Sequence, residues 1–500
     1  DDGNAGQRPQ KRTPFSYSQE IALNLRTILP VAITVLILSG CTQISDPWGR
    51  TGGTPFPRPD TFIPGLHPES KDQGNSLPES IQPGEELTLA QCIVIGLKHN
   101  PVTAVTWHAR ESARSRTGQA GSGYYPSLDL TLGAKRGDPV ELDGRSDTGS
   151  VNTFNAGFGI RYLLFDGGVR SAGVRGAEAE LLSADFKHNA AMRDVALAVE
   201  EAYYMLLAAR QLERVAGDTV RKARYHVDVA SARHNNGIVA RSDVLKAETG
   251  KAEADLTLVR ARSLVRIAHG RLAAAMGLSP SEVFNIADLP EDAHEQEMID
   301  VRELMAQAAK NRPELRSALS LAESKRTGIE GARARHWPEI AVDAGYGWKD
   351  RTYVPEENEW SVGLGISVPL FDGFDRRYSL RHAQAGFRKA VAEYEKLLRE
   401  VELEVWIAYA RLTEAGQAIK AAAALVSSAR QSALAAEGEY KNGTGSVIGV
   451  TDAQTALTAA EVQLVRARLD WYTAMARLER AVGKSLMEDR PDTDQQKEVK

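Results

Sequence analysis

Two short glycine-containing motifs carry residue types that can bind phosphate groups. A G-x-G-x-x-x-G run begins at Gly443, but it follows a helical pattern, whereas a dinucleotide-binding loop follows a strand. A Gly-Lys-Ser run begins at Gly483, but Leu478 stands where a phosphate-binding loop requires its first glycine. The ten histidines are scattered and have no metal-binding spacing. The sequence therefore predicts a protein that is not an enzyme, with no catalytic residue, cofactor or metal.

The chemistry that the sequence does predict is the attachment of lipid to Cys41. The preceding residues 28–40 carry no charge, are too short to span a bilayer as a helix, and follow Arg26, as in a signal peptide. The four residues LSGC that end at Cys41 resemble the bacterial lipoprotein signal, in which the signal peptidase cuts before the cysteine and the cysteine is lipidated. Thr42, in place of aspartate, favours sorting to the outer membrane by the same resemblance. The alternative is a chance run of small residues before a buried cysteine.

The chain divides into a leader, a linker and two copies of one unit. The pairs Leu164 and Leu370, Arg260 and Arg466, and Gly277 and Gly483 recur at an offset of 206, and Pro101 and Pro313 at 212. A single register over this length indicates duplication. We expect a signal-peptide region (1–40), a lipidated N-terminus with a proline-rich linker (41–86), two repeats (87–280 and 281–484) and a polar C-terminal tail (485–500).

Each repeat predicts two long helices joined by an Asn-Gly turn, at Asn236-Gly237 and at Asn442-Gly443. Proline is absent from 140–279 and from 370–490. Apolar residues follow a heptad spacing at Met192, Val195, Val199, Ala202, Leu206 and Ala209, and again at Leu398, Val401, Val405, Ala408, Leu412 and Ala415. Asp166 and Asp372 are expected as N-caps. A helix from 166 to 235 would be about 105 Å long and must bury its apolar stripe in a coiled coil or a helical tube.

Four segments before these helices alternate apolar residues with small or polar residues. They are 128–132, 154–162, 340–348 and 360–368. This period is typical of the wall of a membrane β-barrel with a wet interior; the alternative is a sheet packed on a soluble core. Four strands cannot close a barrel, and an open sheet edge is forbidden in lipid. Strands in a membrane would therefore require the chain to oligomerise.

Together, these features resemble the TolC-type outer-membrane efflux factors over approximately Leu87 to Gly483. The resemblance implies a mainly α fold with a membrane β-barrel, built as a homotrimer. Each protomer would give four strands to one 12-stranded β-barrel, which continues into a periplasmic α-helical barrel. Residues near Leu87–Lys98, near Val283–Gln307 and in the C-terminal tail would form an equatorial belt.

The resemblance also assigns roles to the two turns, which would be the periplasmic tips of two helical hairpins. The tips would contact a periplasmic adaptor protein and close the tube. The predicted adaptor-contact residues are Gly237, Ser242, Gly443, Thr444 and Ser446. Both glycines also suit the left-handed conformation that ends many helices.

A gate residue set follows from the same resemblance. Tyr440 and Asp243 occupy the places of a tyrosine and an aspartate that hydrogen-bond and hold the tip shut. Asp452 matches one of two aspartates at the narrowest point, and three copies around an axis would attract cations. Gly445 replaces the family's arginine and Gly449 replaces its second aspartate. The alternatives are a helix-packing role for Tyr440 and an exposed surface carboxylate for Asp452.

We therefore expect a lipid-anchored outer-membrane exit duct of a tripartite efflux pump, extending into the periplasm and passively exporting small molecules such as drugs, toxic compounds or metal ions. Its partners would be a periplasmic adaptor protein, an inner-membrane transporter and outer-membrane lipid. The net charge of −5 speaks against nucleic acid. A type I protein secretion duct uses the same tube. A structural periplasmic coiled-coil lipoprotein would explain the heptads but not the strands.

Overall fold

The computed structural model describes residues 86–137, 151–288, 300–350 and 358–484, so the predicted lipidation site at Cys41 lies outside the described residues. One order of elements occurs twice. The first copy comprises β1 (Glu86–Leu87), α2 (Leu89–His99), α3 (Pro101–Ser122), β2 (Ser127–Gly137), β3 (Val151–Phe165), α4 (Val169–Asn235) and α5 (Arg241–Ala275). The second comprises β4 (Asn285–Ile286), α6 (Val301–Asn311), α7 (Pro313–Ala334), β5 (Glu339–Asp350), β6 (Glu359–Ser367), α8 (Asp375–Lys441) and α9 (Val447–Val482).

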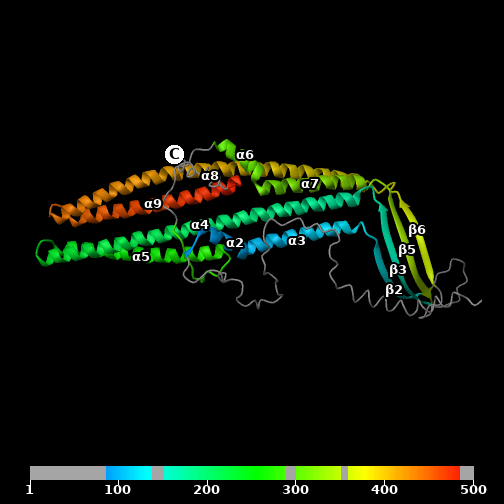
Figure 1. Cartoon of the computed structure of the whole chain (residues 1–500), viewed down its shortest axis with the longest axis horizontal. Helices are drawn as coiled ribbons and strands as arrows, with labels where there is room; N and C mark the ends of the chain where they lie inside the picture. The colour runs from blue at the N-terminus through cyan, green and yellow to red at the C-terminus, as the bar shows by residue number, and fades with distance from the viewer. Residues whose placement is uncertain (1–85, 138–150, 289–299, 351–357, 485–500) are drawn as a thin grey trace, which may run out of the picture. The chain divides into compact units, whose positions relative to one another are not determined.

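The two longest helices, α4 and α8, have 67 residues each, which makes each of them about 100 Å long. Each returns through a short turn into a partner helix, giving the hairpins α4–α5 and α8–α9. The sheet lies at one end of the long helices and the turns at the other (Figure 1). The heptad prediction is confirmed, because Val199 and Val405, at equivalent places in the two copies, are fully buried. None of the helices in the described segments has the length and apolarity needed to cross a membrane.

The predicted N-caps of α4 and α8 are wrong by two residues. The cap positions are Gly168 and Phe374, both in the left-handed conformation. Asp166 still satisfies the start of α4, since its carboxylate accepts hydrogen bonds from the backbone N–H of Gly168 at 3.0 Å and of Arg170 at 2.8 Å. The carboxylate therefore acts from outside the helix, because two further residues are needed to turn the chain from strand into helix.

The four predicted strands are confirmed and form one antiparallel sheet in the order β2-β3-β5-β6. The register places the apolar side chains Leu130, Phe158, Tyr346 and Trp360 in one row across all four strands. Much of this apolar face is exposed, to 73% at Trp360. The opposite face carries small and charged side chains. A sheet with an exposed apolar face and a polar reverse face suits lipid on one side and water on the other.

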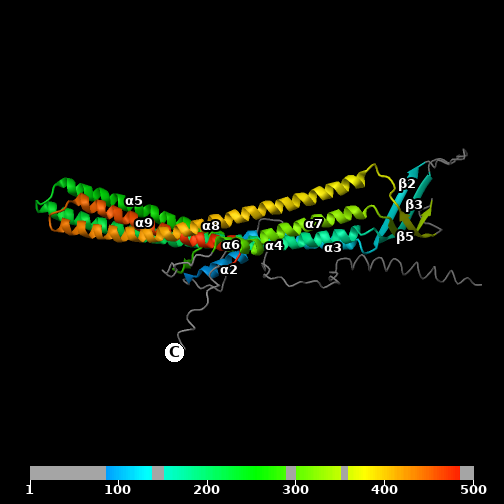
Figure 2. The ribbon, with the colours of Figure 1, turned by 90° about the horizontal axis from the view of Figure 1, so that it is seen from above.

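Neighbouring helices change along the length of the hairpins. Near the sheet the order of packed helices is α3-α4-α7-α8. Near the turns, α4 packs against α5 and α9, and α9 packs against α8 (Figure 2). Among the helices, the two copies therefore meet mainly through α4 with α7 and α4 with α9.

A band of short elements surrounds the middle of the hairpins. β1 pairs with β4 in parallel, and α2 packs on α4 over a core that includes Leu87, Tyr203 and Leu206. The Tyr203 hydroxyl donates to the carbonyl of Ala287 at 2.6 Å. In the second copy α6 packs on α8 and α9. This band joins the start of each repeat to the centre of its long helix.

The two copies use one device to cap the returning helix. Asn100, just before Pro101, donates its side-chain N–H to the carbonyl of Ala275 at 2.9 Å. Arg312, just before Pro313, donates to the carbonyl of Ala481 at 3.2 Å. Both carbonyls belong to the last turn of a helix, where no intrahelical donor remains.

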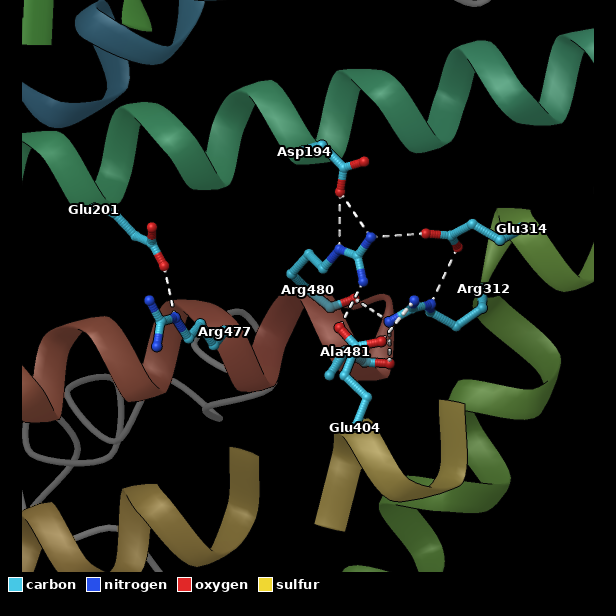
Figure 3. Close-up of polar contacts among 8 residues, drawn as sticks. All are labelled: Asp194, Glu201, Arg312, Glu314, Glu404, Arg477, Arg480 and Ala481. Atoms are coloured by element: carbon cyan, nitrogen blue, oxygen red, sulfur yellow. Dashed lines mark hydrogen bonds and ion pairs between the residues drawn. The ribbon is translucent and has the colours of Figure 1, made fainter. Parts of the chain in front are cut away.

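In the second copy this cap is part of an ion-pair network, which we call the junction network (Figure 3). Arg312, which is only 4% exposed, pairs with Glu404 of α8 at 2.9 Å and with Glu314 at 3.1 Å. Arg480 of α9 pairs with the same two carboxylates, at 2.6 Å and 3.0 Å, and with Asp194 of α4 at 2.7 Å. The junction network therefore fastens the second hairpin to α4 of the first.

Next to the junction network, two glutamates face each other across the contact between α4 and α9. They are Glu200 and Glu479, which line a cavity of about 180 Å³ together with Arg193, Arg480 and Lys484. Burial raises the pKa of Glu200 to about 7, and the negative charges of Glu479 and Glu201 add to this increase.

We expect Glu200→Gln to remove a pH dependence of stability. Because the raised pKa lets the folded protein bind a proton that the unfolded chain has lost, wild-type stability should fall as pH rises from about 4.5 to 7. The variant should match wild type near pH 5 and exceed it by about 2–3 kcal/mol at pH 8. Thermal melts at pH 5, 6, 7 and 8 measure the difference. Glu248→Gln, at an exposed position on α5, is the control. A constant difference between variant and wild type over this range would contradict the expectation.

Candidate functional site

The first turn ends α4 by a left-handed glycine. Gly237 has φ +74°, and its N–H donates to the carbonyl of His234 at 2.8 Å. The N–H of Ile238 donates to the carbonyl of Arg233 at 2.9 Å. These bonds satisfy carbonyls that the helix end leaves unpaired. Ser242 is exposed in the first turn of α5.

The second turn repeats this geometry with additional polar contacts. Gly443 has φ +77°, and its N–H donates to the carbonyl of Tyr440 at 3.2 Å. The N–H and hydroxyl of Thr444 both donate to the carbonyl of Glu439, at 3.0 and 3.1 Å. Ser446 is the N-cap of α9, and its hydroxyl accepts a hydrogen bond from the N–H of Gly449. Side-chain hydrogen bonds therefore support this turn, as those of Asn236 and His234 support the first.

Gly445 is fitted closely into this turn. A Cβ added there would lie 3.0 Å from Cβ of Glu439 and 3.1 Å from the backbone N of Tyr440. A larger residue would therefore require the turn to move.

The two turns meet through a small apolar cluster, which we call the tip cluster. Its buried members are Tyr440, Val447 and Val450, with Val229 of α4 and Ala436 packed against them. Val229 belongs to the first hairpin and the other four to the second. The tip cluster therefore joins the hairpins at the point where they would have to separate if the tip opened.

Arg233 and Lys441 make polar contacts between the two hairpins at this point. The guanidinium of Arg233 lies over the ring of Tyr440, 4.3 Å from the ring centroid. Its Nη2 donates to the carbonyl of Lys441, the last residue of α8, at 3.0 Å. Lys441 reaches in the opposite direction, with Nζ 5.8 Å from the ring centroid of Tyr225 on α4. A hydrogen bond from Lys441 at 2.7 Å lowers the pKa of Glu437 and keeps that carboxylate ionised.

The predicted hydrogen bond between Tyr440 and Asp243 is not formed within the chain. The ring of Tyr440 is buried in the tip cluster, and its hydroxyl has no hydrogen-bond partner among the described residues. Asp243 lies at the start of α5, where its backbone N–H donates to the carbonyl of Ala240. The packing of Tyr440 against α4 directs its contacts to Arg233 and Val229 instead. The gate role assigned to these two residues stays a prediction.

Asp452 is exposed near the start of α9. It lies two residues after Val450, so it extends from the same turn of helix as the tip cluster. Its position next to the turn agrees with the place expected for a constriction residue, and its role there stays a prediction.

Sequence reasoning missed Arg233, although a signal was present. The repeat offset of 206 pairs Arg233 with Glu439, and His234 with Tyr440. Because these equivalent positions carry unlike side chains, they do not make the same contacts in the two copies. The buried ends of the hairpins are therefore less symmetric than the Asn-Gly turns suggest.

The fold and the site define a class of protein: a duplicated helical hairpin with an apolar-faced sheet at one end and paired turns at the other, the architecture of an outer-membrane channel. The chain belongs to the outer membrane efflux protein family, whose model matches residues 93–278 and 304–484.

Known proteins of this kind resemble the chain over most of its length. It is 27% identical to Protein CyaE of Bordetella pertussis over 399 residues, which cover 79% of this chain and 80% of CyaE. It is 22% identical to the toluene efflux pump outer membrane protein TtgC of Pseudomonas putida, over 95% of this chain and 99% of TtgC. The solved structure of the outer membrane protein VceC from Vibrio cholerae superposes with a TM-score of 0.68 and 21% identity, over 79% of this chain and 96% of VceC.

Proposed function

We propose that this chain forms the outer-membrane exit duct of a tripartite efflux pump and lets small molecules leave the cell passively. The duct would be a homotrimer that works with a periplasmic adaptor protein and an inner-membrane transporter, which supplies the energy. The proposal assigns no catalytic residue and no cofactor to the chain. Cys41 would carry a covalent lipid that anchors the chain in the outer membrane, and mass spectrometry of the mature N-terminus checks this modification.

The observation that carries the proposal is that the sheet, the helices near the sheet and the helices near the turns each form a row with two unpaired edges. In the sheet the outer strands are β2 and β6. Near the sheet the outer helices are α3 and α8, and near the turns they are α5 and α8. In every row one edge comes from the first repeat and the other from the second.

Edges of this kind fit a head-to-tail contact between copies. An open strand edge in lipid leaves backbone groups unpaired, so β6 of one copy requires β2 of the next. A contact between unlike edges gives a closed ring when its rotation returns to the first copy. Three copies would bring twelve strands together, enough to close a barrel.

The outer helices carry the apolar side chains that such a contact would bury. Large apolar residues are more than half exposed along both edge helices of the hairpin region: Leu245, Leu256, Val259 and Ile267 on α5, and Leu403, Trp406, Leu425 and Leu434 on α8. Exposed apolar stripes of this length indicate a protein interface. A structural coiled-coil lipoprotein would account for these stripes but not for the exposed apolar face of the sheet.

The proposal is tested by the ion conductance of the purified trimer in planar bilayers, with Asp452→Ala beside wild type. We expect a cation-selective conductance, because three copies of Asp452 would place negative charge around the narrowest point. The variant should lower the ratio of cation to anion permeability roughly threefold or more, since the ring of charge is removed.

Asp470→Ala is the matched control, because Asp470 is also an exposed aspartate on α9 but lies far from the turn. Equal loss of selectivity in both variants would show that Asp452 does not line the constriction. A folded trimer that never conducts, even with its tips disrupted, would contradict the duct itself. A protein secretion duct would be recognised by a partner transporter that delivers polypeptides rather than small molecules.

A further inference from the structure

Arg233 lies on α4 of the first hairpin, but its contacts are with the end of α8 in the second. It extends over the ring of Tyr440 and hydrogen-bonds the carbonyl of Lys441. The last four carbonyls of a helix have no intrahelical donor, and the partial negative charge of the helix dipole gathers there. Arg233 therefore caps the C-terminus of α8 with a positive charge that belongs to the other hairpin.

Both contacts of Arg233 would be lost if the tips separated. A guanidinium stacked on an aromatic ring is stabilised by the ring's electron density, and its charge strengthens the hydrogen bond to the carbonyl. The ring of Tyr440 is 4% exposed and packs against Val229, so the guanidinium covers one side of a buried contact between hairpins. Opening would expose the ring and leave the end of α8 without its cap.

The second hairpin returns a longer contact, since Nζ of Lys441 lies 5.8 Å from the ring centroid of Tyr225 on α4. Glu439 stands at the repeat-equivalent position of Arg233, and its carbonyl is used within its own turn. His234 stands at the position of Tyr440, and its ring Nδ1 lies 3.0 Å from the carbonyl of Val239 in its own turn. Arg233 is therefore the side chain of the first hairpin that caps a helix of the second, and it acts beside the contact of Lys441 with Tyr225 and the apolar tip cluster.

We propose that Arg233 is the positioning residue that holds the tip closed, through the ring of Tyr440 and the carbonyl of Lys441, and that the Tyr440 hydroxyl has no part in closure. This inference rests on the proposed function, because closure has a meaning only in a duct. The family pattern has an arginine in the second turn, where this chain has Gly445. The inference assigns the link between the tips to an arginine of the first hairpin instead.

The test compares the open probability of purified trimers in planar bilayers. Arg233→Ala is expected to raise open probability by about tenfold, since it removes a charge-assisted hydrogen bond and a cation–π contact. Arg233→Lys keeps the charge but not the planar group, so its rise should be smaller. Tyr440→Phe keeps the ring and should behave as wild type, whereas a gate that depends on the hydroxyl would open.

Two controls accompany these variants. Arg221→Ala removes an arginine of α4 whose ion pair, within the described part of the chain, is with Asp218 of its own helix, and it should conduct as wild type. Val450→Asp places a charge in the tip cluster and should open the tip whatever holds it. Migration of the folded trimer and its helical circular dichroism show that each variant assembles.

The outcomes distinguish a failure of the role of Arg233 from a failure of the proposed duct. If Val450→Asp conducts while Arg233→Ala matches wild type, the duct stands and the role of Arg233 is wrong. If Tyr440→Phe opens the channel, closure depends on the hydroxyl and the inference is overturned. If folded trimers of every variant are silent, including Val450→Asp, the duct itself is contradicted.

Discussion

Replacing Arg312 by alanine is expected to lower the stability of the folded chain by about 3 kcal/mol. Arg312 is almost fully buried, and it pairs with Glu404 and Glu314 while capping the carbonyl of Ala481. Without the guanidinium, that carbonyl loses its donor and the two carboxylates keep only Arg480 as a common partner. Removing one member of a buried ion pair costs far more than removing an exposed pair.

The measurement is thermal unfolding followed by helical circular dichroism in detergent, in which we expect a decrease of about 4 °C in the melting temperature. Arg326→Ala is the matched control, because Arg326 also has two carboxylate partners, Glu323 and Glu330, but lies half exposed on α7. Its melting temperature should change by less than about 1 °C. Equal effects of the two substitutions would show that the junction network adds no more than a surface ion pair.

The elements of the fold could be predicted because each follows from a local pattern. The heptad of the first repeat predicted a buried stripe on α4, and Val195, Val199 and Leu206 are buried. Alternation predicted all four strands and the side on which their apolar residues lie, since side chains on a strand alternate between faces. The offset of 206 predicted that both turns would contain a left-handed glycine, as Gly237 and Gly443 do.

Contacts between the hairpins could not be predicted in the same way. Arg233, Arg312 and Arg480 each bind groups on other helices, far away along the chain. Which side chains meet depends on how far one helix is displaced and rotated relative to the next, and periodicity leaves this unspecified. The expected pairing of Tyr440 with Asp243 came from resemblance alone, and the tyrosine ring lies under Arg233 instead. The start of α4 shows the same limit, since Asp166 caps it from two residues outside.

The second large effect is expected from Gly277→Ala. Gly277 ends α5 with φ +76°, a conformation that an L-residue with a Cβ adopts only at a cost of about 1–2 kcal/mol. The added Cβ would also lie 2.5 Å from the carbonyl carbon of His99 and 2.7 Å from the backbone N of Asn100. Since these atoms belong to the backbone that joins α2 to α3, they cannot move as a side chain can. Overpacking adds about 1–3 kcal/mol, so the total loss of stability should be about 2–5 kcal/mol.

Two related glycines separate the strain from the collision, because all three have similar positive φ values. At Gly237 no atom lies within 4 Å of the added Cβ, so Gly237→Ala should cost only the strain, about 1–2 kcal/mol. At Gly483, the repeat equivalent of Gly277, the closest atom is the end of the Arg193 side chain at 2.8 Å, and Asn311 lies at 3.3 Å. Arg193 can move, so the loss of stability in Gly483→Ala should fall between those of the other two variants.

Thermal melts of the three variants should therefore rank Gly237→Ala as the mildest and Gly277→Ala as the most severe. If all three variants had equal melting temperatures, the close approach of α5 to the α2–α3 joint would not contribute to the stability of the fold.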